Sequence, residues 1–356
     1  MEPIAVLVVD DSAVVRRIVA GVLETDPGIR VVGTAASGRI ALQQVERLAP
    51  DILTLDVEMP DMDGLETLRQ LRRLHPRLPV IMFSTLTERA AAATLEALAL
   101  GAHDYVTKPS GAGGTPQAVQ VVRSELLPRI KALVSRGRPA PPRAPTAPPL
   151  GARPARTEPH AILVVGSSTG GPDALETVLR ELPADLPVPV AVVQHMPPIF
   201  TRLFAQRLDR VSGLTVVEAR HGLRLEPGLV AVAPGDTHLL VVEDHGALRV
   251  ATNQETRQNG CRPSVDVLFG SAADALGSRV LACVLTGMGH DGLRGCQRLR
   301  AAGAEIVVQD EATSVVWGMP GAVVAAGLAD RVRPLPAIAA DLADALGSRL
   351  GAGAAP

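Results

Sequence analysis

Short apolar runs alternate with amphipathic stretches through the first third of the chain. The runs predict strands near residues 4–9, 30–35, 51–55, 79–84 and 103–106. The stretches between and after them have helical periodicity and predict five helices. Such alternation is typical of a parallel sheet with helices on both faces and right-handed connections. We therefore predict an N-terminal α/β domain with a five-stranded parallel sheet.

The same alternation resumes near residue 160. Residues 161–165 form a continuous apolar run that predicts a buried strand, followed by a turn of small residues and a helical pattern over 172–182. Further buried strands are predicted over 188–194 and 281–286. A second, doubly wound α/β domain is expected.

The segment between the two patterns is rich in proline. Eight prolines lie between Arg136 and His160, among alanines and arginines, and such a composition favours extended conformations over a packed core. Its five arginines suggest an anionic partner, but a solvated spacer explains them better. The expected boundaries are residues 1–135 for the first domain, 136–159 for the linker and 160–350 for the second domain. The Gly/Ala-rich end, 351–356, is expected to be a disordered tail.

Composition excludes several functional classes. A length of 356 residues suits two domains, and a net charge of -2 with one Trp, one Tyr and four Phe argues against nucleic-acid binding. The three cysteines lack the paired spacing of a zinc site or disulfide framework, which favours a reduced cytoplasmic location. Neither a signal peptide nor a membrane-spanning run is expected, so direct membrane insertion is not predicted.

Acidic residues follow two of the predicted strands in the first domain. Asp10 and Asp11 close the first apolar run, and Asp56 ends the third. Because the carboxyl ends of parallel strands share one edge, these side chains can converge there to hold a hard cation between carboxylate oxygens. The arrangement outlines a phosphoryl-acceptor site.

Three further polar residues fall at predicted strand ends: Ser84, Tyr105 and Lys108. A hydroxyl can hydrogen-bond a phosphoryl oxygen, an ammonium can neutralise its charge, and an aromatic ring can move when the hydroxyl does. Each of these features alone has an ordinary structural explanation. An Asp at the end of a strand commonly caps the next helix, and a Lys-Pro pair is common in loops.

Taken together, residues 1 to about 125 resemble the receiver domain of two-component response regulators. The matching segments are residues 8–12, 55–60, 63–64, 84 and 108–109. The resemblance implies a flavodoxin-like fold and Asp56 as acceptor of a phosphoryl group from a histidine kinase. It also implies that Asp10 and Asp11 help hold Mg²⁺ there, and that Ser84, Tyr105 and Lys108 respond to the modification.

The turn after the first strand of the second domain contains a candidate nucleophile. Gly166-x-Ser168-x-Gly170 matches the G-x-S-x-G pattern, which exposes a serine beside a helix N-terminus. A tight turn of small residues with a serine helix cap explains the segment nearly as well. Nucleotide binding is disfavoured, because Pro172 and Asp173 stand where a phosphate-binding loop has Lys and Ser/Thr.

A nucleophilic serine needs a base, and two histidines follow buried strands. His195 and His290 would both reach the edge that carries Ser168, and spacing alone does not separate them. Asp291 can orient a base and stabilise the imidazolium that forms. The order Ser168, His195, Asp291 differs from the Ser, Asp/Glu, His order of α/β-hydrolases, which indicates a distinct serine hydrolase.

Residues 160 to about 330 resemble the catalytic domain of the chemotaxis protein-glutamate methylesterases, the CheB family. The matching segments are residues 166–171, 194–198, 233–236, 262–266, 286–292 and 318–320. The resemblance implies Ser168 as nucleophile, His195 as general base and Asp291 as its orienting carboxylate. His290 stands where the family often has a small polar residue. Oxyanion donors are expected near Thr169 and in the Met288 loop.

Two positions depart from the family pattern, namely His221, where an acidic residue is expected, and Trp317, where a smaller aromatic is usual. Neither belongs to the expected triad. Met196, Met288 and Met319 could line a groove for a receptor helix or fill the core, and the sequence does not separate these alternatives.

The expected function is therefore a phosphorylation-activated serine esterase that demethylates glutamate methyl esters on chemoreceptor helices, without a cofactor for the esterase step. Glutamine deamidation, which occurs in the family, uses the same acyl chemistry. One alternative is a catalytically degenerate module that docks on receptors and drains phosphoryl groups from the kinase. A transcriptional regulator is disfavoured, because no basic helix follows the linker.

Overall fold

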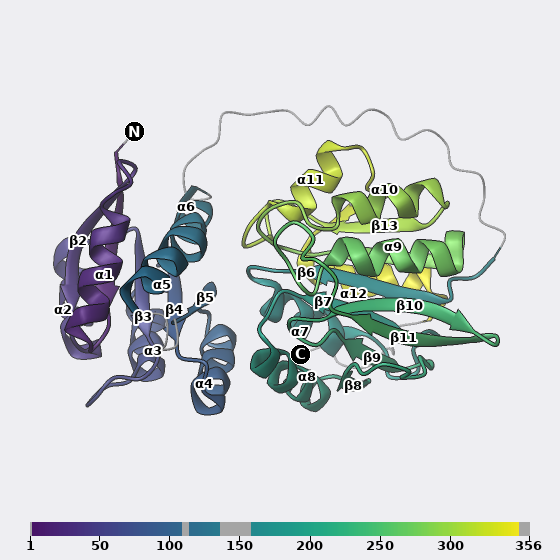
Figure 1. Cartoon of the computed structure of the whole chain (residues 1–356), viewed down its shortest axis with the longest axis horizontal. Coiled ribbons are helices and arrows are strands. Elements are labelled where there is room, and N and C mark those ends of the chain that lie inside the picture. The colour runs from purple at the N-terminus through teal and green to yellow at the C-terminus, as the bar shows by residue number, and fades with distance from the viewer. Residues whose placement is uncertain (1, 109–113, 136–157, 349–356) are drawn as a thin grey trace. The chain divides into compact units, whose positions relative to one another are not determined.

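The computed structural model describes residues 2–108, 114–135 and 158–348, and the chain divides into two compact units, Met1–Arg143 and Ala144–Pro356 (Figure 1). Most of the predicted linker, residues 136–157, and the predicted tail, residues 351–356, lie outside the described part. None of the described helices is long and apolar enough to cross a membrane.

The N-terminal unit is a five-stranded sheet in the order β2-β1-β3-β4-β5, with every neighbouring pair parallel. Its strands are β1 (Ile4–Val9), β2 (Ile29–Ala35), β3 (Ile52–Asp56), β4 (Val80–Ser84) and β5 (Asp104–Thr107). Its helices are α1 (Ala13–Leu23), α2 (Gly38–Leu48), α3 (Gly64–Leu74), α4 (Glu88–Ala99), α5 (Gly114–Val121), the π-helix Val122–Leu126 and α6 (Leu127–Ser135). The predicted strands and fold class are confirmed.

Helices cover both faces of this sheet. Helices α1 and α5 contact each other, and α2, α3 and α4 contact in a row. All residues of β1, β3 and β4 are buried, as their apolar runs require. The strand order reverses between β1 and β3, so a crevice is expected outside the carboxyl ends of those two strands. Asp10 follows β1 and Asp56 ends β3, which places both acids at that crevice.

The C-terminal unit contains a seven-stranded sheet, in the order β14-β13-β12-β6-β7-β9-β8, with parallel neighbours, and an antiparallel hairpin of β10 and β11. The strands are β6 (Ile162–Ser167), β7 (Val190–Gln194), β8 (Thr215–Glu218), β9 (Leu229–Val232), β10 (His238–Asp244), β11 (Ala247–Asn253), β12 (Val280–Val284), β13 (Glu305–Gln309) and β14 (Arg331–Arg333). The helices are α7 (Gly171–Glu181), α8 (Pro198–Val211), α9 (Val265–Leu276), the 3-10 helix Gly277–Arg279, α10 (Leu293–Ala301), α11 (Met319–Ala325) and α12 (Leu335–Ala345).

This unit is doubly wound, as predicted. Helix α10 contacts α9 and α11, while α7 contacts α8 and α12, so the sheet lies between two groups of helices (Figure 1). Strand β6 pairs with β7 on one side and β12 on the other. Residues that follow these three strands therefore meet at one edge of the sheet.

Candidate functional site

The acidic residues of the N-terminal unit converge at the carboxyl edge of its sheet. One carboxylate oxygen from each of Asp10, Asp11 and Asp56 lies within 4.8 Å of the others. Asp10 and Asp56 are buried, whereas Asp11 is exposed. Lys108 reaches in from the end of β5, with Nζ 2.7 Å from Asp10 Oδ2 and 2.7 Å from Asp56 Oδ2.

This cluster fits a hard divalent cation. Burial raises the pKa of Asp56 to about 6, although the nearby Lys108 ammonium opposes the increase. Asp10 Oδ2 is buried, and among the described residues the cation that faces it is the Lys108 ammonium, 2.7 Å away. Closely spaced oxygen ligands with one exposed member suit Mg²⁺, which keeps several waters when bound.

The other predicted switch residues lie inside the fold. Ser84 is fully buried, and its Oγ accepts a hydrogen bond from Thr94 Oγ1 at 2.8 Å. Tyr105 is also buried, and burial raises the pKa of its hydroxyl well above the usual value. In the described structure neither side chain is hydrogen-bonded to Asp56, so their response to phosphorylation stays a prediction.

In the C-terminal unit, Ser168 follows the central strand β6. Ser167 pairs with Gln194 in the sheet, and the His195 N–H donates to the Ser167 carbonyl at 3.3 Å. Ser168 donates its own N–H to the carbonyl of Thr286, beyond the end of β12, at 3.0 Å. Ser168 therefore lies between the residues that extend β7 and those that extend β12.

The turn around Ser168 is fixed by its neighbours. Gln194 Nε2 donates to the Ser168 carbonyl at 2.9 Å, and Gln194 Oε1 accepts from Ser167 Oγ at 2.7 Å. Gly170 has φ of 74°, and a Cβ there would lie 2.4 Å from Val315, so both conformation and space require glycine. Helix α7 starts at Gly171, and its N-terminus favours negative charge near Ser168.

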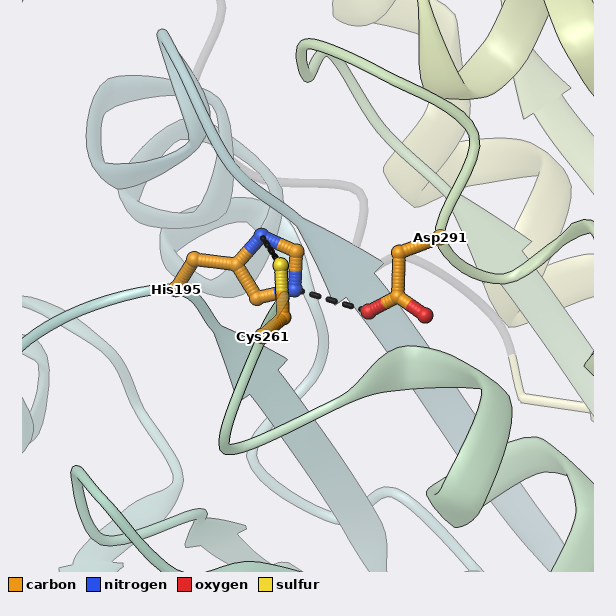
Figure 2. Close-up of side chains that lie close together, drawn as sticks. All are labelled: His195, Cys261 and Asp291. Atoms are coloured by element: carbon orange, nitrogen blue, oxygen red, sulfur yellow. Dashed lines mark hydrogen bonds and ion pairs between the residues drawn. The ribbon is translucent and has the colours of Figure 1, made fainter. Parts of the chain in front are cut away.

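His195 and Asp291 meet across the end of β6, with Nε2 2.9 Å from Oδ2 (Figure 2). His195 extends β7, and Asp291 lies in the loop after β12. Because β6 lies between those strands, the pair spans the strand that carries Ser168. The structure thus brings His195 to Asp291, while His290 is exposed.

Asp291 is held at the N-terminus of α9. Its Oδ1 accepts hydrogen bonds from Ser264 Oγ at 2.8 Å, Asn259 Nδ2 at 3.1 Å and the Asp266 N–H at 3.2 Å, and its Oδ2 accepts from the Val265 N–H at 2.7 Å. Burial alone would raise the pKa of Asp291, but His195, the Val265 N–H and the Ser264 hydroxyl lower it to about 2. Asp291 is therefore an ionised acceptor.

The ionised carboxylate determines the tautomer of His195. An acceptor-only group facing Nε2 requires a proton on that nitrogen, so neutral His195 has its lone pair on Nδ1. Burial lowers the pKa of His195, but Asp291 and Cys261 outweigh it and the pKa is raised. The site therefore stabilises the imidazolium that a general base becomes.

A residue that the sequence analysis did not select, Cys261, lies at the other side of the His195 ring. Its Sγ is 3.7 Å from Nδ1 (Figure 2). Cys261 is half-buried, whereas Cys283 and Cys296 are fully buried. The only sequence signal for Cys261 was its place directly before the Arg262–Asp266 segment.

The Ser168 hydroxyl is not bonded to the candidate base. Within the described part of this unit, no hydrogen bond joins Ser168 Oγ to His195.

The remaining predicted residues divide between site and core. Thr169 is buried, and its carbonyl accepts from Thr286 Oγ1 at 2.9 Å. Met196 and Met319 are buried, and Met319 belongs to an apolar core cluster of the C-terminal unit. Met288 is half-buried in the loop that carries Asp291. Core packing therefore explains Met196 and Met319 better than a receptor groove does.

Two family models match the chain, one within each of its two compact units. Residues 6–120 match the family model for the response regulator receiver domain, and residues 163–342 match the model for CheB methylesterase. The chain is 54% identical over 349 residues to a protein-glutamate methylesterase/protein-glutamine glutaminase of Nocardioides sp., covering 94% of this chain and 93% of that one.

A second relative and a solved structure support the same grouping. A protein-glutamate methylesterase/protein-glutamine glutaminase 2 of Pseudomonas aeruginosa is 46% identical over 341 residues and covers 96% of each chain. The crystal structure of the Thermotoga maritima CheB methylesterase catalytic domain is 42% identical, with a TM-score of 0.51 over 52% of this chain and 98% of that chain.

Proposed function

Since the chain belongs to the CheB methylesterase family and carries a receiver domain ahead of its catalytic domain, we propose that it demethylates glutamate methyl esters on the cytoplasmic helices of chemoreceptors. The products are glutamate and methanol. Phosphorylation of Asp56 by a histidine kinase activates the reaction. The observation that carries the catalytic assignment is the His195–Asp291 pair, which spans the strand end bearing Ser168.

Ser168 acts as the nucleophile in this proposal. Its hydroxyl attacks the ester carbonyl while His195 Nδ1, the nitrogen that does not face Asp291, takes the proton. The charge on the imidazolium is balanced by Asp291, which stays ionised because of its hydrogen bonds. His195 then gives that proton to the departing methoxide, which leaves as methanol. Water next attacks the acyl-enzyme carbonyl and gives a proton to His195, which returns it to the Ser168 oxygen as the glutamate carboxylate is released.

The oxyanion is stabilised by backbone N–H groups near Thr169 and in the Met288 loop, with the N-terminus of α7 adding a favourable dipole. Deamidation of receptor glutamines follows the same steps with ammonia as the leaving group. Nothing in the described site favours a degenerate module, because all three triad residues are present at one edge of the sheet.

The receiver residues act on the phosphoryl group. Asp10, Asp11 and Asp56 would hold Mg²⁺, which would supply positive charge to the phosphoryl oxygens. Lys108 already pairs with Asp10 and Asp56, so its ammonium is placed to neutralise the modified side chain. We also propose a cytoplasmic location, where the three unpaired cysteines stay reduced.

Asp56→Asn is expected to remove stimulation by a phosphoryl donor, because the amide cannot form the acyl phosphate. The measurement is methanol release from a methylated receptor fragment with and without acetyl phosphate and Mg²⁺. The wild-type rate should rise with the donor, and the Asp56→Asn rate should not change. Chelating Mg²⁺ should prevent the rise in the wild type.

The matched control is Asp61→Asn, which removes an exposed carboxylate in the same region. Asp61 has φ of 66°, a conformation that asparagine tolerates. This variant should be stimulated like the wild type. Stimulation of the Asp56→Asn protein would show that the phosphoacceptor is another residue.

A further inference from the structure

We propose that His195 Nδ1 and Cys261 Sγ form a binding site for one thiophilic divalent cation, with Zn²⁺ as the probe, and that a bound ion blocks the esterase. The blocking rests on the proposed role of His195 as base, whereas the binding does not. The proposal adds a ligand role for Cys261, which takes no part in the mechanism above.

The gap between the two atoms has the size of a zinc bridge. Zinc binds thiolate sulfur at about 2.3 Å and imidazole nitrogen at about 2.0–2.1 Å, in tetrahedral geometry. Two such ligands of one ion lie about 3.6 Å apart. Cys261 Sγ and His195 Nδ1 are 3.7 Å apart, so an ion fits between them with little movement.

Asp291 prepares the histidine for a metal without binding it. Metal-ligating histidines commonly donate their second N–H to a carboxylate, which fixes the tautomer and raises ligand basicity. His195 makes this contact through Nε2 and therefore presents its lone pair at Nδ1. Asp291 is an unfavourable direct ligand, because both its oxygens already accept hydrogen bonds from buried donors.

Cys261 is placed and exposed as a ligand needs to be. Two backbone hydrogen bonds between Gln258 and Cys261, of 3.0 and 2.7 Å, close the turn that holds the side chain. Apart from His195, its Sγ contacts the Asn259 carbonyl, at 3.7 Å. The thiol is half-buried, so water can complete the coordination of an ion. By contrast, Cys283 and Cys296 are fully buried.

The ligand types separate this site from the receiver cluster. Thiolate and imidazole select Zn²⁺ or Co²⁺, whereas the carboxylates of Asp10, Asp11 and Asp56 suit Mg²⁺. An ion between Cys261 and His195 would occupy the lone pair of Nδ1, which must accept the proton of Ser168. Bound Zn²⁺ should therefore stop the esterase, and a chelator should restore it.

The activity test uses the full chain in excess Mg²⁺ without a phosphoryl donor. Methanol release is measured against Zn²⁺ concentration and again after chelation. Wild-type inhibition should saturate and reverse. Inhibition of each variant is expressed as a fraction of its own rate without Zn²⁺. Cys261→Ala and Cys261→Ser should each raise the inhibitory Zn²⁺ concentration at least about tenfold above that of the wild type. Loss of even an outer-shell partner costs a metal site about that much affinity.

Two controls address other zinc ligands. His245→Ala removes a histidine whose side chain is 96% exposed, and His290→Ala removes the exposed histidine beside Asp291. Both variants should be inhibited like the wild type. Unchanged inhibition of the Cys261 variants, or its loss in either histidine control, would overturn the site.

A spectroscopic test separates the site from the enzyme activity. Co²⁺ added to the Ser168→Ala protein should produce the near-ultraviolet charge-transfer absorption of a cobalt–thiolate bond, and Cys261→Ser should remove it. Absence of this absorption overturns the site even if the chain is an esterase. Its presence supports the site even if no methanol is released, in which case the proposed function fails instead. If the cobalt–thiolate absorption appeared but Zn²⁺ did not inhibit the esterase, the binding site would stand and the proposed inhibition would be wrong.

Discussion

Ser168→Ala is expected to abolish methanol release from a methylated receptor fragment while the protein stays folded. In the proposed mechanism the Ser168 hydroxyl forms the bond to the substrate carbonyl, and removing a triad nucleophile costs on the order of 10⁴-fold or more in rate. The fold should persist, because the backbone of Ser168 holds the turn. Its N–H donates to the Thr286 carbonyl, and its carbonyl accepts from Gln194 Nε2. Circular dichroism would check it.

The comparison variant is Cys261→Ala, because Cys261 is the nucleophilic side chain in contact with His195. Cys261→Ala should keep measurable turnover and Ser168→Ala should not. Full activity in a folded Ser168→Ala protein would refute the serine esterase assignment. If Cys261→Ala were the inactive variant, the nucleophile would be a thiol.

His195→Gln is expected to lower the rate by several orders of magnitude, because glutamine can still donate a hydrogen bond to Asp291 but cannot accept the proton of Ser168. His290→Gln should stay within about twofold of the wild type, because the His290 side chain is exposed and substitutions of exposed residues usually change free energies by less than about 0.5 kcal/mol. Single-turnover methanol release from both variants tests which histidine is the general base. Loss of activity in His290→Gln alone would reassign the base.

The fold and the approximate location of the sites could be predicted because they depend on local patterns. Continuous apolar runs marked the parallel strands, and parallel strands bring their following residues to one edge. This reasoning placed Asp10 near Asp56, and Ser168 near both candidate histidines. The spacing could not separate His195 from His290, because that depends on how one loop turns.

The details that sequence reasoning missed come from contacts between distant segments. Asp291 is fixed by Asn259 and Ser264, 32 and 27 positions away along the chain. Cys261 reaches His195 over a separation of 66 residues. Ser84 is a polar strand end that the fold turns inward to Thr94. The hairpin of β10 and β11 also went unpredicted. None of these contacts leaves a periodic signal.

Asp291 closes the first turn of α9 and also orients the imidazole of His195. One carboxylate thus makes the proposed chemistry depend on a folded helix terminus. Fraying of that single turn would remove three of the four donors described above, those of Ser264, Val265 and Asp266, and leave Asn259, while the seven-stranded sheet beneath stayed intact. Activity would then fade before the domain melts, so loss of esterase on heating would report the opening of one helix end and not global unfolding.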